Sequence, residues 1–272
     1  MSLSETKRLL RTFRIVPNRV LGQNFMVEPS LFLKLTEYAA LRRSDVVLDA
    51  GAGFGFLTRF MADKCEAVVA VEKDPRVAAV LRAQIKNCTN VAVVEGDMLK
   101  AELPAFNKVV AIPPYYLSSR FITWLLERKT ERVVLILQRE FADKLVAPVG
   151  SEDYGWLTVV VFHEAQVELL DLVHKSMFYP QPEVDSVIVR LTRWKESPFK
   201  VEDEEFFKRL VRWLFTQRNK KICNALVPLL KNARKINKEE ANRLASKVPF
   251  CDKRARELSP RDFGELADDL AD

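Results

Sequence analysis

Short runs of apolar, largely β-branched residues alternate with segments of helical period from residue 29 to about residue 150. The runs predict buried strands at Val46–Asp49, Ala67–Glu72, Val91–Val94, Lys108–Ile112 and Arg132–Gln138. The segments between them predict helices that begin near Pro29, Phe54, Asp74, Ser118 and Arg139. Strands that alternate with helices are typical of the α/β class, so we expect a doubly wound, mostly parallel sheet.

The pattern changes after residue 150. Trp156–His163, Gln166–Leu172 and Ser186–Thr192 are strand-like with little helix between them, which indicates an antiparallel edge to the sheet. If two of these runs act as one pair, the sheet has seven strands.

Periodicity is lost over Arg193–Lys200, and amphipathic helices follow near residues 203–216, 219–231, 238–247 and 260–268. This break predicts two domains. We expect a Rossmann-like catalytic domain over residues 1–192 and a small all-α domain over residues 200–272.

The composition favours a cytoplasmic protein. The 272 residues are 48% hydrophobic and 29% charged, and the first 20 residues carry five arginine or lysine side chains without an apolar core. The four cysteines form no C-x-x-C pair, and only His163 and His174 could complete a zinc site. We therefore expect a reducing compartment, no membrane span and no structural metal.

Basic residues gather at the two ends of the chain. Residues 1–20 have a net charge of +4 and residues 193–272 of +5, whereas residues 21–192 have a net charge of −3. Phosphate contacts supply much of the affinity of proteins for nucleic acids, so one interpretation is a polyanion held by both ends. An ordinary solvated surface would show the same charges.

The first predicted strand runs into the glycine-rich segment Asp49-Ala50-Gly51-Ala52-Gly53-Phe54-Gly55. Glycines at this point let the backbone pass close to a ligand, and Glu72 at the end of the next strand stands where a carboxylate could bind ribose hydroxyls. A dinucleotide fingerprint would have Gly or Ala at position 56, where this chain has Phe56. The departure disfavours a nicotinamide-dependent oxidoreductase.

A third carboxylate, Asp97, closes the next strand, where it could accept a hydrogen bond from an adenine amino group; by itself it could equally be a turn residue. Asp49, Gly51, Gly53, Glu72 and Asp97 together resemble the S-adenosylmethionine site of class I methyltransferases.

The fourth strand ends in Ala111-Ile112-Pro113-Pro114-Tyr115-Tyr116. Prolines hold the preceding residues extended, so the carbonyl groups of Ile112 and Pro113 can face a cleft as acceptors, with Tyr115 as a flat surface for a base. The alternative is a rigid turn that packs an aromatic ring.

The chain resembles the small-subunit ribosomal RNA adenine dimethyltransferase family over nearly its whole length. The resemblance lies in these segments: Leu21-Gly22-Gln23-Asn24-Phe25-Met26, Gln138-Arg139-Glu140-Phe141-Ala142, Tyr154-Gly155-Trp156-Leu157-Thr158, Phe178–Ser186 and Phe215–Lys221. It implies that Gln23, Asn24 and Met26 lie over the methionine part of S-adenosylmethionine and that Phe178 packs on a flipped adenine opposite Tyr115. It also places RNA-binding residues Arg218, Lys220 and Lys221 at a basic helix start.

One position departs from the family pattern N-L-P-Y, which reads Ile112-Pro113-Pro114-Tyr115 here. The family asparagine accepts a hydrogen bond from the target amino group, which the isoleucine side chain cannot do. The resemblance implies a monomeric methyltransferase that acts on small-subunit rRNA or the pre-ribosomal small subunit. The alternative is a ribosome-assembly factor of the same fold with weak or no methylation; we favour the enzyme because the other site motifs are intact.

Overall fold

The computed structural model describes residues 2–271, which form two compact units. The first comprises residues 2–142 and 167–193, and the second comprises residues 143–166 and 194–271. This division differs from the expected one over residues 143–166, which pack with the C-terminal helices rather than with the sheet domain.

The first unit is built on a seven-stranded sheet, counted over the described residues. In spatial order the strands are β4 (Val91–Glu95), β3 (Ala67–Glu72), β2 (Val46–Ala50), β5 (Lys108–Ala111), β6 (Arg132–Gln138), β9 (Ser186–Arg193) and β7 (Ala165–Val173). Strands β4 to β6 are parallel, and β9 pairs with β6 in antiparallel register, Ile136 opposite Ile188. The expected mostly parallel sheet is confirmed. Its central strands are fully buried, as their continuous apolar runs require.

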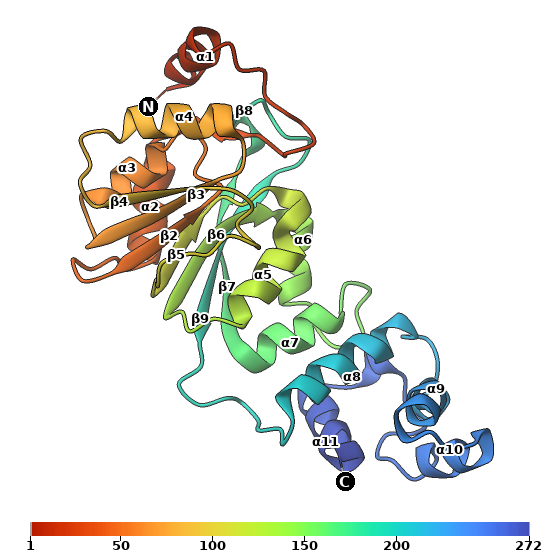
Figure 1. Ribbon diagram of the computed structural model, residues 1–272. Helices are drawn as coiled ribbons and strands as arrows, with labels where there is room; N and C mark the ends of the chain where they lie inside the picture. The colour runs from red at the N-terminus through yellow and green to blue at the C-terminus, as the bar shows by residue number, and fades with distance from the viewer. Residues whose placement is uncertain (1, 272) are drawn as a thin grey trace. The chain divides into compact units, whose positions relative to one another are not determined.

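The helices of this part of the chain are α1 (Leu3–Thr12), α2 (Ser30–Tyr38), α3 (Phe56–Ala62), α4 (Pro75–Gln84), α5 (Ser118–Leu126) and α6 (Arg139–Leu145) (Figure 1). Helices α2 to α6 begin close to the expected residues. The loop between β2 and α3 has positive φ at Gly51 and Gly53, so the chain turns sharply at the carboxyl end of the sheet.

Helix α1 was not expected from the sequence, because its three basic residues, with Arg14 and Arg19 beyond it, were interpreted only as charge. Its Leu9 and Leu10 are buried against Val77 and Val80 of α4, in a cluster that also contains Phe25 and Phe54. Figure 1 shows α1 beside α4. The basic N-terminal segment is therefore an amphipathic helix with one face in the core.

A second, two-stranded sheet joins two distant segments of the first unit. Strand β1 (Phe25–Met26) pairs antiparallel with β8 (Phe178–Tyr179), so that Met26 is opposite Phe178. Strands of two residues give no detectable alternation in a sequence, and this pairing was not predicted.

The second unit contains α7 (Trp156–Glu164), α8 (Glu204–Thr216), α9 (Ile222–Arg234), α10 (Lys238–Ala245) and α11 (Pro260–Ala271). The four C-terminal helices agree with those expected, but the strand expected at Trp156–His163 is wrong. Helix α7 is buried on nearly all sides, including Val159, Val160 and Val161, so it has no polar face to reveal a helical period. Its β-branched residues then imitate a buried strand.

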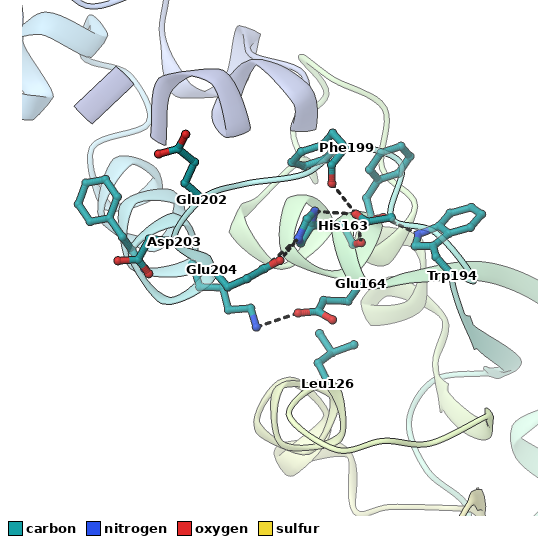
Figure 2. Close-up of polar contacts among 12 residues, drawn as sticks. Leu126, His163, Glu164, Trp194, Phe199, Glu202, Asp203 and Glu204 are labelled. Carbon is teal, nitrogen blue, oxygen red and sulfur yellow. Dashed lines mark hydrogen bonds and ion pairs between the residues drawn. The ribbon is translucent and has the colours of Figure 1, made fainter. Parts of the chain in front are cut away.

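The expected break at residues 193–200 is held against α7 by polar contacts (Figure 2). The buried His163 ring packs against both Phe199 and Phe207, and its Nε2 is 3.0 Å from both carboxylate oxygens of Glu204. Ser197 Oγ lies 3.2 Å from His163 Nδ1, and the Trp194 indole donates to the Phe162 carbonyl. The segment is aperiodic but ordered by side-chain contacts.

None of the helices within residues 2–271 is both long and apolar enough to cross a membrane. Over the same residues, no cluster of three or more histidine, cysteine or acidic side chains could hold a metal ion.

Candidate active site

The glycine-rich loop and the proline turn meet at the carboxyl ends of β2 and β5. A Cβ atom on Gly51 would lie 3.4 Å from Pro114 Cδ and 3.5 Å from the Ile112 carbonyl oxygen, and Gly51 has a φ of +81°. A side chain at this position would be strained in conformation and would crowd the proline turn. The Ile112 carbonyl therefore lies beside the glycine-rich loop.

Glu72 binds the backbone on both sides of the site. Its Oε2 accepts from the Gly53 N–H and its Oε1 from the Asp74 N–H, both at 2.9 Å. The side chain is only 8% exposed, and burial raises the pKa of the carboxyl, an effect that the backbone hydrogen bonds partly offset. The carboxylate is thus fixed in position beside the glycine-rich loop.

Asp49 is more deeply buried, at 1% exposure, and its Oδ2 accepts from the Thr58 hydroxyl at 2.6 Å. Burial raises the pKa of Asp49 to about 7; the Thr58 hydrogen bond opposes this shift and the charge of Glu72 adds to it. A positively charged ligand nearby would favour the ionised form.

Asp97 is paired with Lys73, which the sequence analysis did not single out. Its Oδ2 lies 3.1 Å from Lys73 Nζ, and its Oδ1 accepts from the Leu99 N–H at 3.1 Å. Burial raises the pKa of Asp97, but these hydrogen bonds and the lysine charge outweigh it, so the pKa lies below its usual value. Asp97 is therefore a carboxylate at neutral pH.

These side chains line two adjoining pockets in the first unit. The larger, of about 600 Å³ and open to solvent, is bordered by Gln23, Asn24, Gly51, Gly53, Glu72, Lys73, Asp97, Met98, Ile112, Pro114 and Tyr116, among others. The second, of about 430 Å³, shares Asn24, Gly51, Gly53 and Ile112 and adds Met26 and Asp49. All nine residues expected to bind the cofactor thus border one continuous region.

The N-terminal segment closes one side of this region. Gln23 donates to Asp74 Oδ2 at 3.0 Å and accepts from the Asn18 N–H at 2.8 Å, so its side chain secures the loop. The rings of Phe25 and Phe54 stack with centroids 4.2 Å apart. Met26 is 5% exposed and belongs mainly to the core.

A groove of about 1250 Å³ adjoins the pockets through Gly22, Gln23, Asn24 and Tyr116. Tyr115, Gln138 and the segment Pro180–Glu183 also line it. The Tyr115 hydroxyl is 2.7 Å from Ser186 Oγ, which is fully buried, and burial raises the pKa of Tyr115. Ser186 thus fixes the edge of the Tyr115 ring.

Phe178 does not line this groove as the resemblance implied. The side chain is 3% exposed and packs in the core cluster that contains Met26, because the pairing of β1 with β8 turns it inward. Pro113 is also buried, whereas Pro114 borders the larger pocket. Among the residues that line the groove, Tyr115 and Tyr116 are the aromatic ones.

Functional candidates that the sequence analysis missed are Lys73, Tyr116 and Ser186. Lys73 directly follows Glu72, and Ser186 closes the Phe178–Ser186 motif, but their partners depend on strand register. Tyr116 is 54% exposed and borders both the larger pocket and the groove. The sequence signal that could have identified Tyr116 was its position as an aromatic residue directly after the proline turn.

The predicted RNA-binding residues lie in the second unit, between α8 and α9. Arg218 donates to the Ser151 and Glu152 carbonyls, Lys220 to Gln217 Oε1, and Lys221 forms an ion pair of 2.8 Å with Asp252. Lys221 and Asp252 are both largely exposed, so the pair remains open to exchange with an external anion.

The sheet, with its antiparallel strand β9 and its glycine-rich loop after β2, defines a Rossmann-like methyltransferase. The chain belongs to the ribosomal RNA adenine dimethylase family, whose model matches residues 16–258.

Its relatives carry the same class of name. A probable ribosomal RNA small subunit methyltransferase A from Thermococcus kodakarensis is 36% identical over 264 residues, which cover 96% of this chain and 93% of the relative. The crystal structure of a dimethyladenosine transferase from Plasmodium falciparum is similar with a TM-score of 0.75, 27% identity and coverage of 89% and 95%. The 23S rRNA methyltransferase ErmE has a TM-score of 0.66 and 30% identity, with coverage of 92% and 100%.

Proposed function

We propose that this protein is an S-adenosylmethionine-dependent rRNA adenine-N6 methyltransferase that modifies adenosines in a loop of small-subunit rRNA during ribosome biogenesis. We further propose that it works as a monomer in the cytoplasm. The observation that carries the proposal is the continuity of the carboxylate-lined pocket with the Tyr115 groove across Gly22, Asn24 and Tyr116.

The residues fit S-adenosylmethionine. Glu72 and Asp97 offer acceptors to hydroxyl and amino groups, and the glycine-rich loop has no Cβ atoms that would obstruct a ligand beside Ile112 and Pro114. Buried Asp49 offers negative charge to a cationic ligand. When bound, this cofactor supplies the activated methyl group. A dinucleotide fits less well, because Phe56 occupies the position where close helix packing prefers a small residue.

The chain's own contribution is to position the adenine and accept its hydrogens. The adenine amino group is a poor nucleophile, because its lone pair is delocalised into the ring. Acceptors at the carbonyl groups of Ile112 and Pro113 orient that amino group, and Tyr115, held by Ser186, offers a face for stacking. The base must leave its stack to enter the groove, which favours a single-stranded loop of RNA as substrate.

Incubation of small-subunit RNA or pre-ribosomal particles with the protein and methyl-labelled cofactor tests the proposal. We expect label in methylated adenosine, identified by mass spectrometry of nucleosides, and its loss in Tyr115→Ala. Tight binding of RNA and cofactor without methylation by any variant would instead indicate the assembly factor. Failure to bind the cofactor would overturn both functions.

A further inference from the structure

Two cysteines of the second unit lie side by side, although they are far apart in the sequence. Cys223 is the second residue of α9 and Cys251 lies in the loop that follows α10, and the Cys223 N–H donates to the Cys251 carbonyl at 3.1 Å. Next to them, the Ile222 N–H donates to the Lys253 carbonyl at 2.8 Å and Lys221 forms a bridge with Arg254. The two segments thus run antiparallel beside each other, joined by one bridge and two backbone hydrogen bonds.

This pairing brings the backbone within disulfide range. A hydrogen bond between the N–H of one residue and the carbonyl of another, with standard bond lengths, leaves their Cα atoms roughly 5 to 6.5 Å apart. Disulfides span Cα separations of about 4.4 to 6.8 Å. Both thiols are free and half-buried, so a soluble oxidant can reach them.

We propose that Cys223 and Cys251 form a reversible disulfide that joins the two basic loops 217–221 and 250–254. The loops are already tied by the Lys221–Asp252 ion pair and by the Arg254 guanidinium, which donates to the Asn219 carbonyl at 2.7 Å. The disulfide closes the chain from Cys223 to Cys251, which includes α9 from its second residue on and all of α10.

The chemistry balances with a disulfide oxidant such as oxidised glutathione. One cysteine thiolate attacks a glutathione sulfur, forms a mixed disulfide and releases one glutathione thiolate. The second cysteine thiolate then attacks the protein sulfur of the mixed disulfide and releases the second glutathione. The protein thiols lose two electrons and two protons, and oxidised glutathione becomes two reduced molecules.

The surroundings set the rate of this exchange. Partial burial and the negative charge of Asp252 raise the pKa of Cys251, with a contribution from Cys223 itself. The thiolate is the attacking form, so oxidation by glutathione speeds up as the pH rises from 7 to 9.

The test uses the full-length native protein, oxidised glutathione and tryptic mass spectrometry under non-reducing conditions. We expect a linked pair of the peptides 222–231 and 248–253, with two of the four thiols lost. Cys223→Ser and Cys251→Ser should abolish the linkage, and the matched control Cys88→Ser should retain it. The oxidised protein should unfold on the order of 5 to 10 °C higher than the reduced one, because a long loop is closed in the unfolded chain.

Three results would overturn the proposal. The linked peptides could be absent from native protein yet present after denaturation in urea, which would show that the folded backbone holds the thiols apart. Cys223→Ser could lose thiols as fast as the wild type, which would place the oxidation elsewhere. A lower unfolding temperature of the oxidised protein would show that the bond distorts the fold. None of these readouts depends on methylation or RNA binding.

Discussion

Glu72 connects the glycine-rich loop to the strand end that follows it, through its hydrogen bonds to the N–H groups of Gly53 and Asp74. The same carboxylate borders the larger pocket, so it has a structural and a proposed binding role. Loss of a hydrogen bond to a buried polar group costs about 1 to 3 kcal/mol.

We therefore expect Glu72→Ala to weaken S-adenosylmethionine binding roughly ten- to a hundredfold, measured by calorimetric titration. Glu95→Ala is the matched control, because Glu95 pairs with Glu72 on the neighbouring strand but is exposed and bound to Arg82. Equal affinities of both variants and the wild type would remove Glu72 from the binding site.

Ile112 is the residue at which this chain departs from the family pattern. Its side chain packs against the core cluster of Met26 and Val110, while its carbonyl faces Gly51. The position therefore retains a backbone acceptor and lacks a side-chain acceptor.

Ile112→Asn should raise the single-turnover rate of methylation up to about a hundredfold, because a preorganised hydrogen bond to a group that gains charge is worth about that factor. Ile112→Leu, which keeps the apolar packing, should leave the rate near that of the wild type. Equal rates in the wild type and the asparagine variant would mean that the backbone carbonyls suffice. Lost cofactor binding in the asparagine variant would mean that the pocket is shaped around an apolar residue.

The residue-level predictions from the sequence depended on strand ends. Asp49, Glu72 and Asp97 lie at or just after the carboxyl end of a recognisable strand, and parallel strands bring such residues to one edge. The Tyr115–Ser186 and Lys73–Asp97 contacts could not be predicted, because they depend on side-chain direction and on the register of β9 against β6. Phe178 was misplaced because the pairing of β1 with β8 leaves no trace in the sequence pattern.

At the scale of elements, the basic loop between α8 and α9 is the part of the second unit to which the family resemblance assigns RNA binding. Lys220 and Lys221 are exposed, and their partners are side chains at the surface. Each phosphate contact releases counterions, so loss of contacts reduces the salt dependence of binding.

Replacement of Arg218, Lys220 and Lys221 by alanine should weaken binding to small-subunit RNA across sequences and reduce the log–log salt slope by roughly two to three. Cofactor affinity should stay the same. The control replaces the exposed Lys238 and Arg243 of α10 and Lys247 just beyond it with alanine, which removes the same charge from the same unit. An unchanged slope in the loop variant would identify the loop as an ordinary solvated surface.

Helices could be predicted from the sequence where one face is buried and the other is exposed, because the apolar residues then recur with the helical period. Helix α8, with Phe207, Leu210 and Leu214 buried on one side and acidic residues in its first turn, illustrates this. Helix α7 has no polar face and therefore gives no clear period. Helix α1 is amphipathic, with Leu9 and Leu10 buried, and was missed because its basic residues were interpreted only as charge. The grouping of residues 143–166 with the second unit follows from the helical state of α7 and was missed with it.

At the scale of the whole molecule, the buried Asp49 links stability to pH. Its pKa is raised from 3.8 to about 7, so folding takes up a proton between these values. The stability that the protonated form contributes is fully present below pH 4 and is lost as the pH rises through 7.

Asp49→Asn should abolish this loss, because asparagine stays neutral and can still accept from Thr58. Urea unfolding should show that the free energy of unfolding of the variant, relative to that of the wild type, rises by about 3 kcal/mol from pH 5 to pH 8. Glu37→Gln, a change at an exposed carboxylate, serves as the control. Parallel pH profiles of the wild type and Asp49→Asn would show that the carboxyl titrates normally.

The pairing of β1 with β8 has a consequence for the order of events in turnover. The loop that closes the pocket over Gln23 and Asn24 continues directly into β1, and β8 continues into Pro180–Glu183 of the groove. A molecule held in the groove therefore also holds the pocket loop in place through the backbone hydrogen bonds of this small sheet. Under the proposed function, spent cofactor should leave more slowly while RNA is bound, so the RNA should dissociate between successive methyl transfers rather than remain bound through them.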